Sequence, residues 1–101
     1  MSGYNLHVTV AVDATAEERV VDLDDLLGVT GQHYGEAVFD VVNEGSASAY
    51  FKHADDTVVS AIEVPAGMRR ESLPYAYPGL PSFVALLGAN CRLTASTRGR
   101  L

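Results

Sequence analysis

The sequence predicts an all-β protein, a small β-sandwich or jelly-roll-like barrel of about seven to eight strands with at most one short helical turn. Short segments in which apolar and polar residues alternate recur along the chain, and turn-forming residues lie between them. Nowhere do apolar residues keep a helical spacing for long. Because about seven or eight strands are too many for one open sheet around so small a core, two packed sheets or a closed barrel are favoured.

Length and composition indicate a single domain over residues 1–101. The chain has 101 residues, close to the commonest domain size, and shows no internal repeat or linker. Hydrophobic residues make up 48% and charged residues 20%, which is typical of a globular protein and unlike a disordered chain. We therefore expect one domain with a buried core.

The clearest pattern lies in residues 37–51, AVFDVVNEGSASAYF, which predicts two strands joined by a tight turn. Apolar residues fall on every second position on both sides of the turn, so each strand has one face that can be buried. Residues 43–46 would reverse the chain, because Asn and Gly tolerate the positive φ of short hairpin loops. We expect Phe39 and Phe51 to lie in the core, facing each other across the hairpin or into the opposite sheet.

The other elements follow the same alternation. Between the first strand and the central pair, Asp22 or Asp24 could cap a single helical turn through Leu26 and Leu27 that ends at Gly28 and closes one end of the core. The irregular alternation in 58–64 indicates a bulge. Strands are expected at residues 6–13, 37–42, 47–52, 58–64, 68–73, 83–87 and 91–97.

Residues able to carry catalysis do not form a recognisable set, so we expect no catalytic, metal or cofactor site and no enzyme. Cys91 alternates with apolar residues of the last strand, which predicts a buried, inert thiol. The nearest candidate metal ligands, His53, Asp55 and Asp56, share one loop and lack the second ligand pair typical of structural zinc sites. No glycine-rich loop for phosphate follows a strand and begins a helix.

Charge and hydropathy limit the classes of partner that we expect this protein to bind. The net charge of −6 argues against nucleic acid, whose binding requires clustered Lys and Arg. The charge is uneven, because residues 1–63 carry 12 acidic and 2 basic residues and residues 64–101 carry 1 and 5. Copies or neighbours could dock acidic to basic, or folding could interleave the halves. No apolar run approaches the length of a membrane span, and no secretory signal opens the chain, so we expect synthesis in a cytoplasm.

A tyrosine- and proline-rich segment at residues 73–82 is the best candidate for contact with a partner. Tyr75 and Tyr77 could anchor a protein or stack on a sugar, although they could equally cover the edge of the core. Arg69 and Arg70 precede them in a short strand as two exposed cations. We therefore predict partner binding by Tyr75, Tyr77, Arg69 and Arg70, with association into a homo-oligomer or onto a larger lattice.

The order of segments VVDLDDLLG, AVFDVVNEGSASAYF and IEVPAGMRRESL, followed by an alternating strand that ends near Thr97, resembles small β-rich structural proteins of tailed bacteriophages and related particles. The resemblance covers residues 20–97. It implies a non-enzymatic virion component, such as a capsid decoration, head-fibre or tail-associated protein, made in the host cytoplasm. Such a protein would bind other virion proteins or copies of itself. The alternative is a stand-alone ligand-binding β-sandwich, for example one that binds carbohydrate on Tyr75 and Tyr77.

Overall fold

Two antiparallel sheets packed face to face make up the computed structural model, which describes residues 5–27, 36–53, 62–74 and 82–98. Within these ranges the chain forms eight strands and one short helix. The all-β sandwich that the sequence predicts is therefore confirmed. No helix in the described ranges has the length and apolar character needed to cross a membrane.

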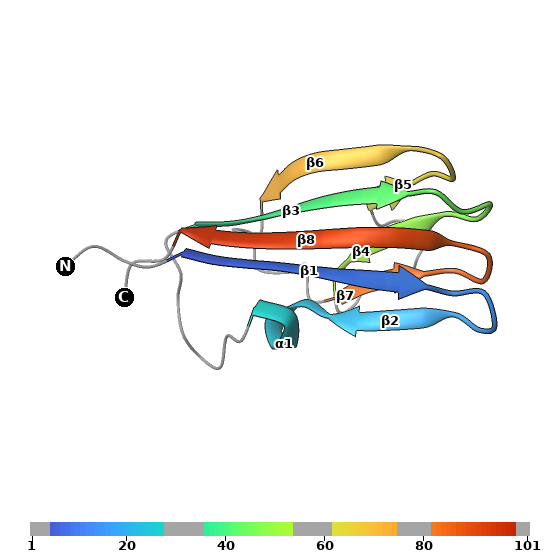
Figure 1. The fold of residues 1–101 in the computed structure, drawn as a ribbon, viewed down its shortest axis with the longest axis horizontal. Helices are drawn as coiled ribbons and strands as arrows, with labels where there is room; N and C mark the ends of the chain where they lie inside the picture. Colours follow the sequence, from blue (N-terminus) through green and yellow to red (C-terminus); the bar gives the residue numbers. More distant parts are fainter. Residues whose placement is uncertain (1–4, 28–35, 54–61, 75–81, 99–101) are drawn as a thin grey trace.

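Each sheet has four strands (Figure 1). Sheet A contains, in spatial order, β1 (Asn5–Asp13), β8 (Asn90–Arg98), β3 (Glu36–Asn43) and β6 (Arg69–Pro74). Sheet B contains β2 (Arg19–Asp22), β7 (Ser82–Ala85), β4 (Ala49–Lys52) and β5 (Ile62–Val64). The antiparallel pairs β1·β8, β2·β7, β3·β6 and β4·β5 are nested inside one another along the chain. This nesting across two sheets is the topology of a jelly roll.

The tight hairpin predicted over residues 37–51 is wrong. β3 lies in sheet A and β4 in sheet B, so the connection between them crosses from one sheet to the other. The connection from β3 to β4 contains no residue with positive φ. Among the described residues, positive φ occurs at Ser72, Gly67 and Gly88, which lie elsewhere. Gly45 is required for another reason: a Cβ there would lie 2.5 Å from the backbone N of Asn90, too close for any side chain.

Three phenylalanines join the two sheets at the centre of the core. Phe39 of β3 and Phe51 of β4 have ring centroids 5.6 Å apart, and Phe51 lies 4.9 Å from Phe83 of β7. All three side chains are fully buried. The prediction that Phe39 faces Phe51 is confirmed, across the sandwich and not across a hairpin.

The predicted helical turn is α1 (Leu23–Leu27). Asp22 caps it, because its Oδ1 accepts the backbone N–H groups of Asp24 at 2.9 Å and Asp25 at 3.2 Å. Leu23 is fully buried, and α1 contacts β1, β2 and β8. The turn therefore packs against the inner face of sheet A.

A bulge interrupts β6, an edge strand of sheet A. The pairing of β3 with β6 shifts between Phe39 and Val41, which leaves one extra residue in β6. Ser72 there has φ 58°, and its N–H donates to Asp40 Oδ1 at 2.7 Å. The bulge predicted in residues 58–64 falls largely outside the described residues, since β5 is described from Ile62 onward.

Candidate functional site

Four short connections gather at one end of the sandwich, on the right in Figure 1. They are residues 14–18, 44–48, 65–68 and 86–89, and we call them together the loop end. Backbone hydrogen bonds of 2.9 Å link three of them: Ala14 N–H donates to Ala89 O, Gly88 N–H to Ala14 O, and Ser46 N–H to Gly88 O. These bonds therefore hold together three connections that are distant in sequence.

Asn43 is the buried polar residue beneath the loop end, with an exposed fraction of 0%. Its Nδ2 donates to Ala47 O at 2.8 Å and to Val64 O at 3.1 Å. Its Oδ1 accepts from the backbone N–H of Gly45 at 3.0 Å and of Asn90 at 3.4 Å. One amide thus ties β3, β5, β8 and the 44–48 connection together.

The sequence offered a signal for this role that the turn interpretation missed. Asn43 shares the parity of Phe39 and Val41 along β3, and both of those side chains face the core. A polar side chain on the buried face must find hydrogen-bond partners, so position 43 was predictable as buried and bonded.

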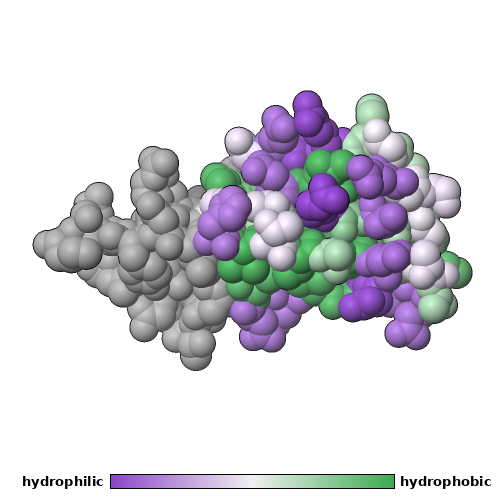
Figure 2. Space-filling view, viewed as in Figure 1, coloured by the Kyte–Doolittle hydropathy of each residue, from purple (hydrophilic) through white to green (hydrophobic). Residues whose placement is uncertain are grey.

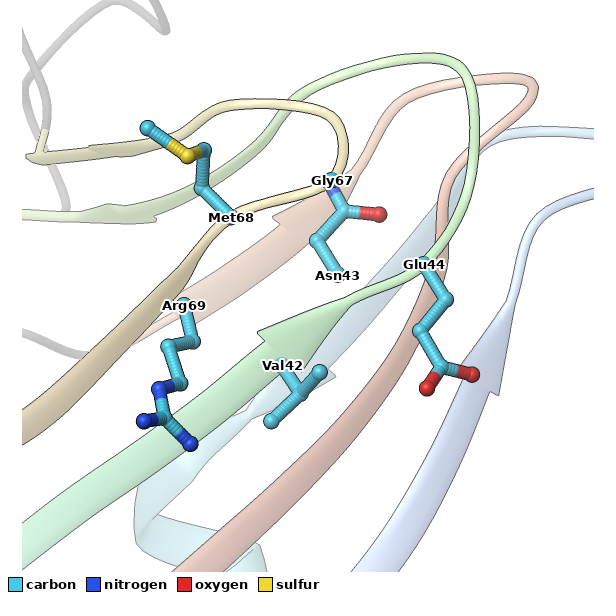
Figure 3. A pocket seen from close by; sticks show the side chains of 6 residues that line it. All are labelled: Val42, Asn43, Glu44, Gly67, Met68 and Arg69. Carbon is cyan, nitrogen blue, oxygen red and sulfur yellow. The ribbon is translucent and has the colours of Figure 1, made fainter.

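A surface pocket of about 470 Å³ lies beside the loop end, between the end of β3 and the β5–β6 turn (Figure 3). Val42 and Met68 contribute apolar surface, and Figure 3 shows Arg69 and Glu44 on either side of Val42. The remaining lining residues are Asn43 and Gly67. An apolar patch flanked by opposite charges suits a partner's apolar side chain with a polar neighbour.

The predicted partner-binding residues separate into three groups. Arg69 lines the pocket, and its side chain is 68% exposed with Nη1 at 3.7 Å from Glu71 Oε2. Arg70 turns the other way and donates from Nε to Glu63 O of β5 at 3.1 Å, which ties the two sheets at this edge. Tyr75 and Tyr77 lie outside the described residues. The structure thus brings Arg69, but not Arg70, to the pocket.

Two exposed apolar side chains also lie at the loop end. Met68 is 57% exposed on the β5–β6 turn and Leu87 is 59% exposed on the β7–β8 turn. Val20, 61% exposed, lies elsewhere, on β2. Apolar side chains on fixed turns lose little further freedom on binding, so they are suitable anchors for a protein surface.

Side chains that could bind a metal or act as a nucleophile do not lie together in the described part of the chain. It contains no group of three or more His, Cys, Asp or Glu placed to hold a metal ion. Cys91 is 2% exposed, and burial raises the pKa of its thiol to about 11, so the thiol is protonated at neutral pH. His7 Nδ1 lies 3.1 Å from Ser96 Oγ on the exposed face of sheet A.

The charged residues that line the pocket are Glu44 and Arg69, and its lining contains no His, Cys, Ser or Thr. No protein-family model matches this chain, and a search of curated proteins found no match.

Proposed function

We propose that this protein is a non-enzymatic structural component of a virion, a capsid decoration, head-fibre or tail-associated protein, that binds its neighbours through the loop end. The observation that carries the proposal is the loop end itself, where backbone hydrogen bonds hold the turns that present Met68 and Leu87 to solvent. A preordered surface with apolar anchors suits protein–protein assembly.

The fold and the sequence resemblance support the same proposal. Jelly rolls recur in viral capsid proteins, although a fold alone does not establish a function. The segments that resemble phage structural proteins include the 44–48 connection and the β5–β6 turn, and both contribute to the pocket. Arg69 at the pocket, with Tyr75 and Tyr77 farther along the chain, extends the proposed contact surface.

Co-sedimentation with purified capsid particles from the source of the chain tests the proposal. Replacing both exposed anchors, Met68→Ser with Leu87→Ser, should weaken particle binding about tenfold or more, because apolar contact area is lost. The matched control is Val20→Ser, since Val20 is equally exposed but lies outside the loop end. The proposal is contradicted if wild-type protein does not co-sediment with the particle, or if the double variant binds the particle as tightly as wild type does.

A ligand-binding module is the second candidate, supported by the open pocket beside Arg69 and by the use of jelly rolls in lectins. A glycan array should then show saturable binding that Tyr77→Ala abolishes. Saturable binding without any particle association would favour the module over the virion component.

A further inference from the structure

β1 lies at the edge of sheet A with a row of open backbone groups. Ala14 N–H donates to Ala89 O, and Glu44 N–H donates to Asn90 O, so consecutive residues of β8 bond alternately to β1 and β3. Even-numbered residues of β1 therefore bond to β8, and odd-numbered residues direct their N–H and C=O groups away from it. In the described ranges, no strand pairs with that side of β1.

The open groups belong to His7, Thr9 and Ala11, because Arg19 Nη1 reaches Asp13 O at 3.5 Å at the end of the strand. The helix α1 contacts β1, β2 and β8, and in Figure 1 it lies on the side of β1 away from β8. No backbone hydrogen bond joins α1 to His7, Thr9 or Ala11, so the described residues leave these groups without a backbone partner.

The other three edges are unsuitable for strand addition. β6 carries the bulge, the left-handed Ser72 and two arginines, features that discourage pairing at an edge. β2 has four residues, and the described part of β5 has three. β1, by contrast, runs for nine residues in unbroken register with β8.

Along β1, residues 6–12 contain no Asp, Glu, Lys or Arg, and the exposed outer face carries His7, Thr9 and Ala11. Val8 and Val10 are only half-buried, although their side chains face the core. Figure 2 shows a hydrophobic strip on this face where β1 runs in Figure 1, with hydrophilic side chains above it over β6. A long, regular, uncharged edge with exposed apolar surface is one that pairs with another strand.

We propose that β1 pairs with β1 of a second copy of this chain, antiparallel and about a two-fold axis at Thr9, so that the two A sheets become one continuous sheet. In this register Thr9 lies opposite Thr9 of the second copy, and His7 lies opposite its Ala11. These odd-numbered pairs exchange both their N–H···O bonds.

The strand is self-complementary in this register. Asp13 falls opposite the uncharged Asn5, so no like charges meet across the axis, whereas like charges directly opposite would destabilise the pair. The small side chain of Ala11 leaves room for the imidazole of His7. This dimer would form in solution whether or not the protein also binds a particle, so its test is separate from that of the proposed function.

The first experiment is sedimentation velocity from about 1 µM to about 1 mM protein. Thr9→Pro removes an N–H that points to the open edge and leaves the bonds to β8 intact, because proline is tolerated where the N–H faces solvent. We expect Thr9→Pro to raise the dimer dissociation constant about tenfold to a hundredfold. Thr9→Ala, which also loses the 3.1 Å contact between the Oγ1 atoms of Thr9 and Thr94 but keeps the N–H, should dimerise as wild type does.

The second experiment fixes the register by cross-linking. Thr9→Cys places two thiols on a pair whose Cα atoms are about 5.5 Å apart, within disulfide range, so mild oxidation should give a covalent dimer. Ala11→Cys lies on the same exposed face, but its Cα lies about 14 Å from that of its own copy, so it should run as a monomer on a gel without reducing agent. The native Cys91 is buried and does not interfere.

Three results would overturn the inference: wild-type protein that is monomeric throughout the concentration series, a dimer unaffected by Thr9→Pro, or cross-linking of Ala11→Cys in place of Thr9→Cys. If Thr9→Pro does not fold, the two cysteine variants decide the question alone.

Discussion

Asn43 makes several of the hydrogen bonds beneath the loop end with a single side chain. Four hydrogen bonds of its amide are satisfied inside the protein, and the described buried side chains leave no nitrogen or oxygen without a partner. Removing such a group leaves its buried partners without a hydrogen bond and away from water. This lowers stability by more than the bonds themselves contribute.

We expect Asn43→Ala to lower the free energy of unfolding by about 2–4 kcal/mol, because buried backbone groups of neighbouring elements lose their partner. Urea unfolding followed by circular dichroism measures the change. The matched control is Asn90→Ala: Asn90 is exposed and uses its backbone here, so its side-chain truncation should change stability by less than about 0.5 kcal/mol. Equal effects of the two substitutions would contradict the role of Asn43.

Cys91 should make the fold sensitive to alkali. Burial raises the pKa of its thiol from 9.0 to about 11, so the folded state favours the protonated form. The resulting stability is fully present below pH 9 and is lost as the pH rises from about 9 to about 11. Unfolding free energies measured at pH 8 and at pH 10.5 should therefore differ more for wild type than for Cys91→Ala, whose other titrating groups are unchanged. An identical pH dependence in both proteins would show that the thiolate is not disfavoured in the fold.

At the scale of the element, β3 is the strand whose two faces differ most clearly in burial. Its inner face carries Phe39 and Val41, both buried, and its outer face carries Val38, Asp40 and Val42, all partly exposed. Simple alternation predicts this division correctly, since the burial of one sheet face follows from the period of two.

Phe39→Ala should lower the free energy of unfolding by about 3–5 kcal/mol, because the vacated space lies between the sheets against Phe51. Val38→Ala on the outer face of the same strand should cost much less, since its side chain is only half-buried. Thermal and urea unfolding of the two variants test the assigned register, which would be wrong if Val38→Ala were the more damaging change.

Strand partners were harder to predict than strand positions. The residues NEGS, at the end of β3 and the start of the connection to β4, suit a hairpin. The connection instead crosses between the sheets, and Gly45 in it closely approaches Asn90 and the β7–β8 turn. That requirement comes from a segment more than 40 residues away and leaves no local signal. Arg69 and Arg70 are both exposed but do not share one surface, because neighbours in a strand face opposite ways and Arg70 donates to Glu63 O on β5.

At the scale of the whole molecule, the alternating pattern and the number of segments were enough to predict a two-sheet sandwich or jelly roll. The pocket was not predictable, because it joins the end of β3 to a turn that follows β5 in the other sheet. Arg69 is the one pocket residue that the sequence indicates as partner-binding, and it does so through its charge and not through its place in the fold.

The nested pairing of the strands also favours one order of strand pairing during folding, because the entropic cost of loop closure is lowest for the innermost pair. The innermost pair, β4·β5, closes the shortest loop, and each pair formed around it shortens the loop that the next must close. The outermost pair joins Asn5 to Arg98, nearly the two ends of the chain. Such long-range contacts slow folding, and on the ribosome β1 must wait for β8 to be synthesised. Until β8 is made, β1 has no strand partner, so β1 is the strand of sheet A that waits longest for a neighbour.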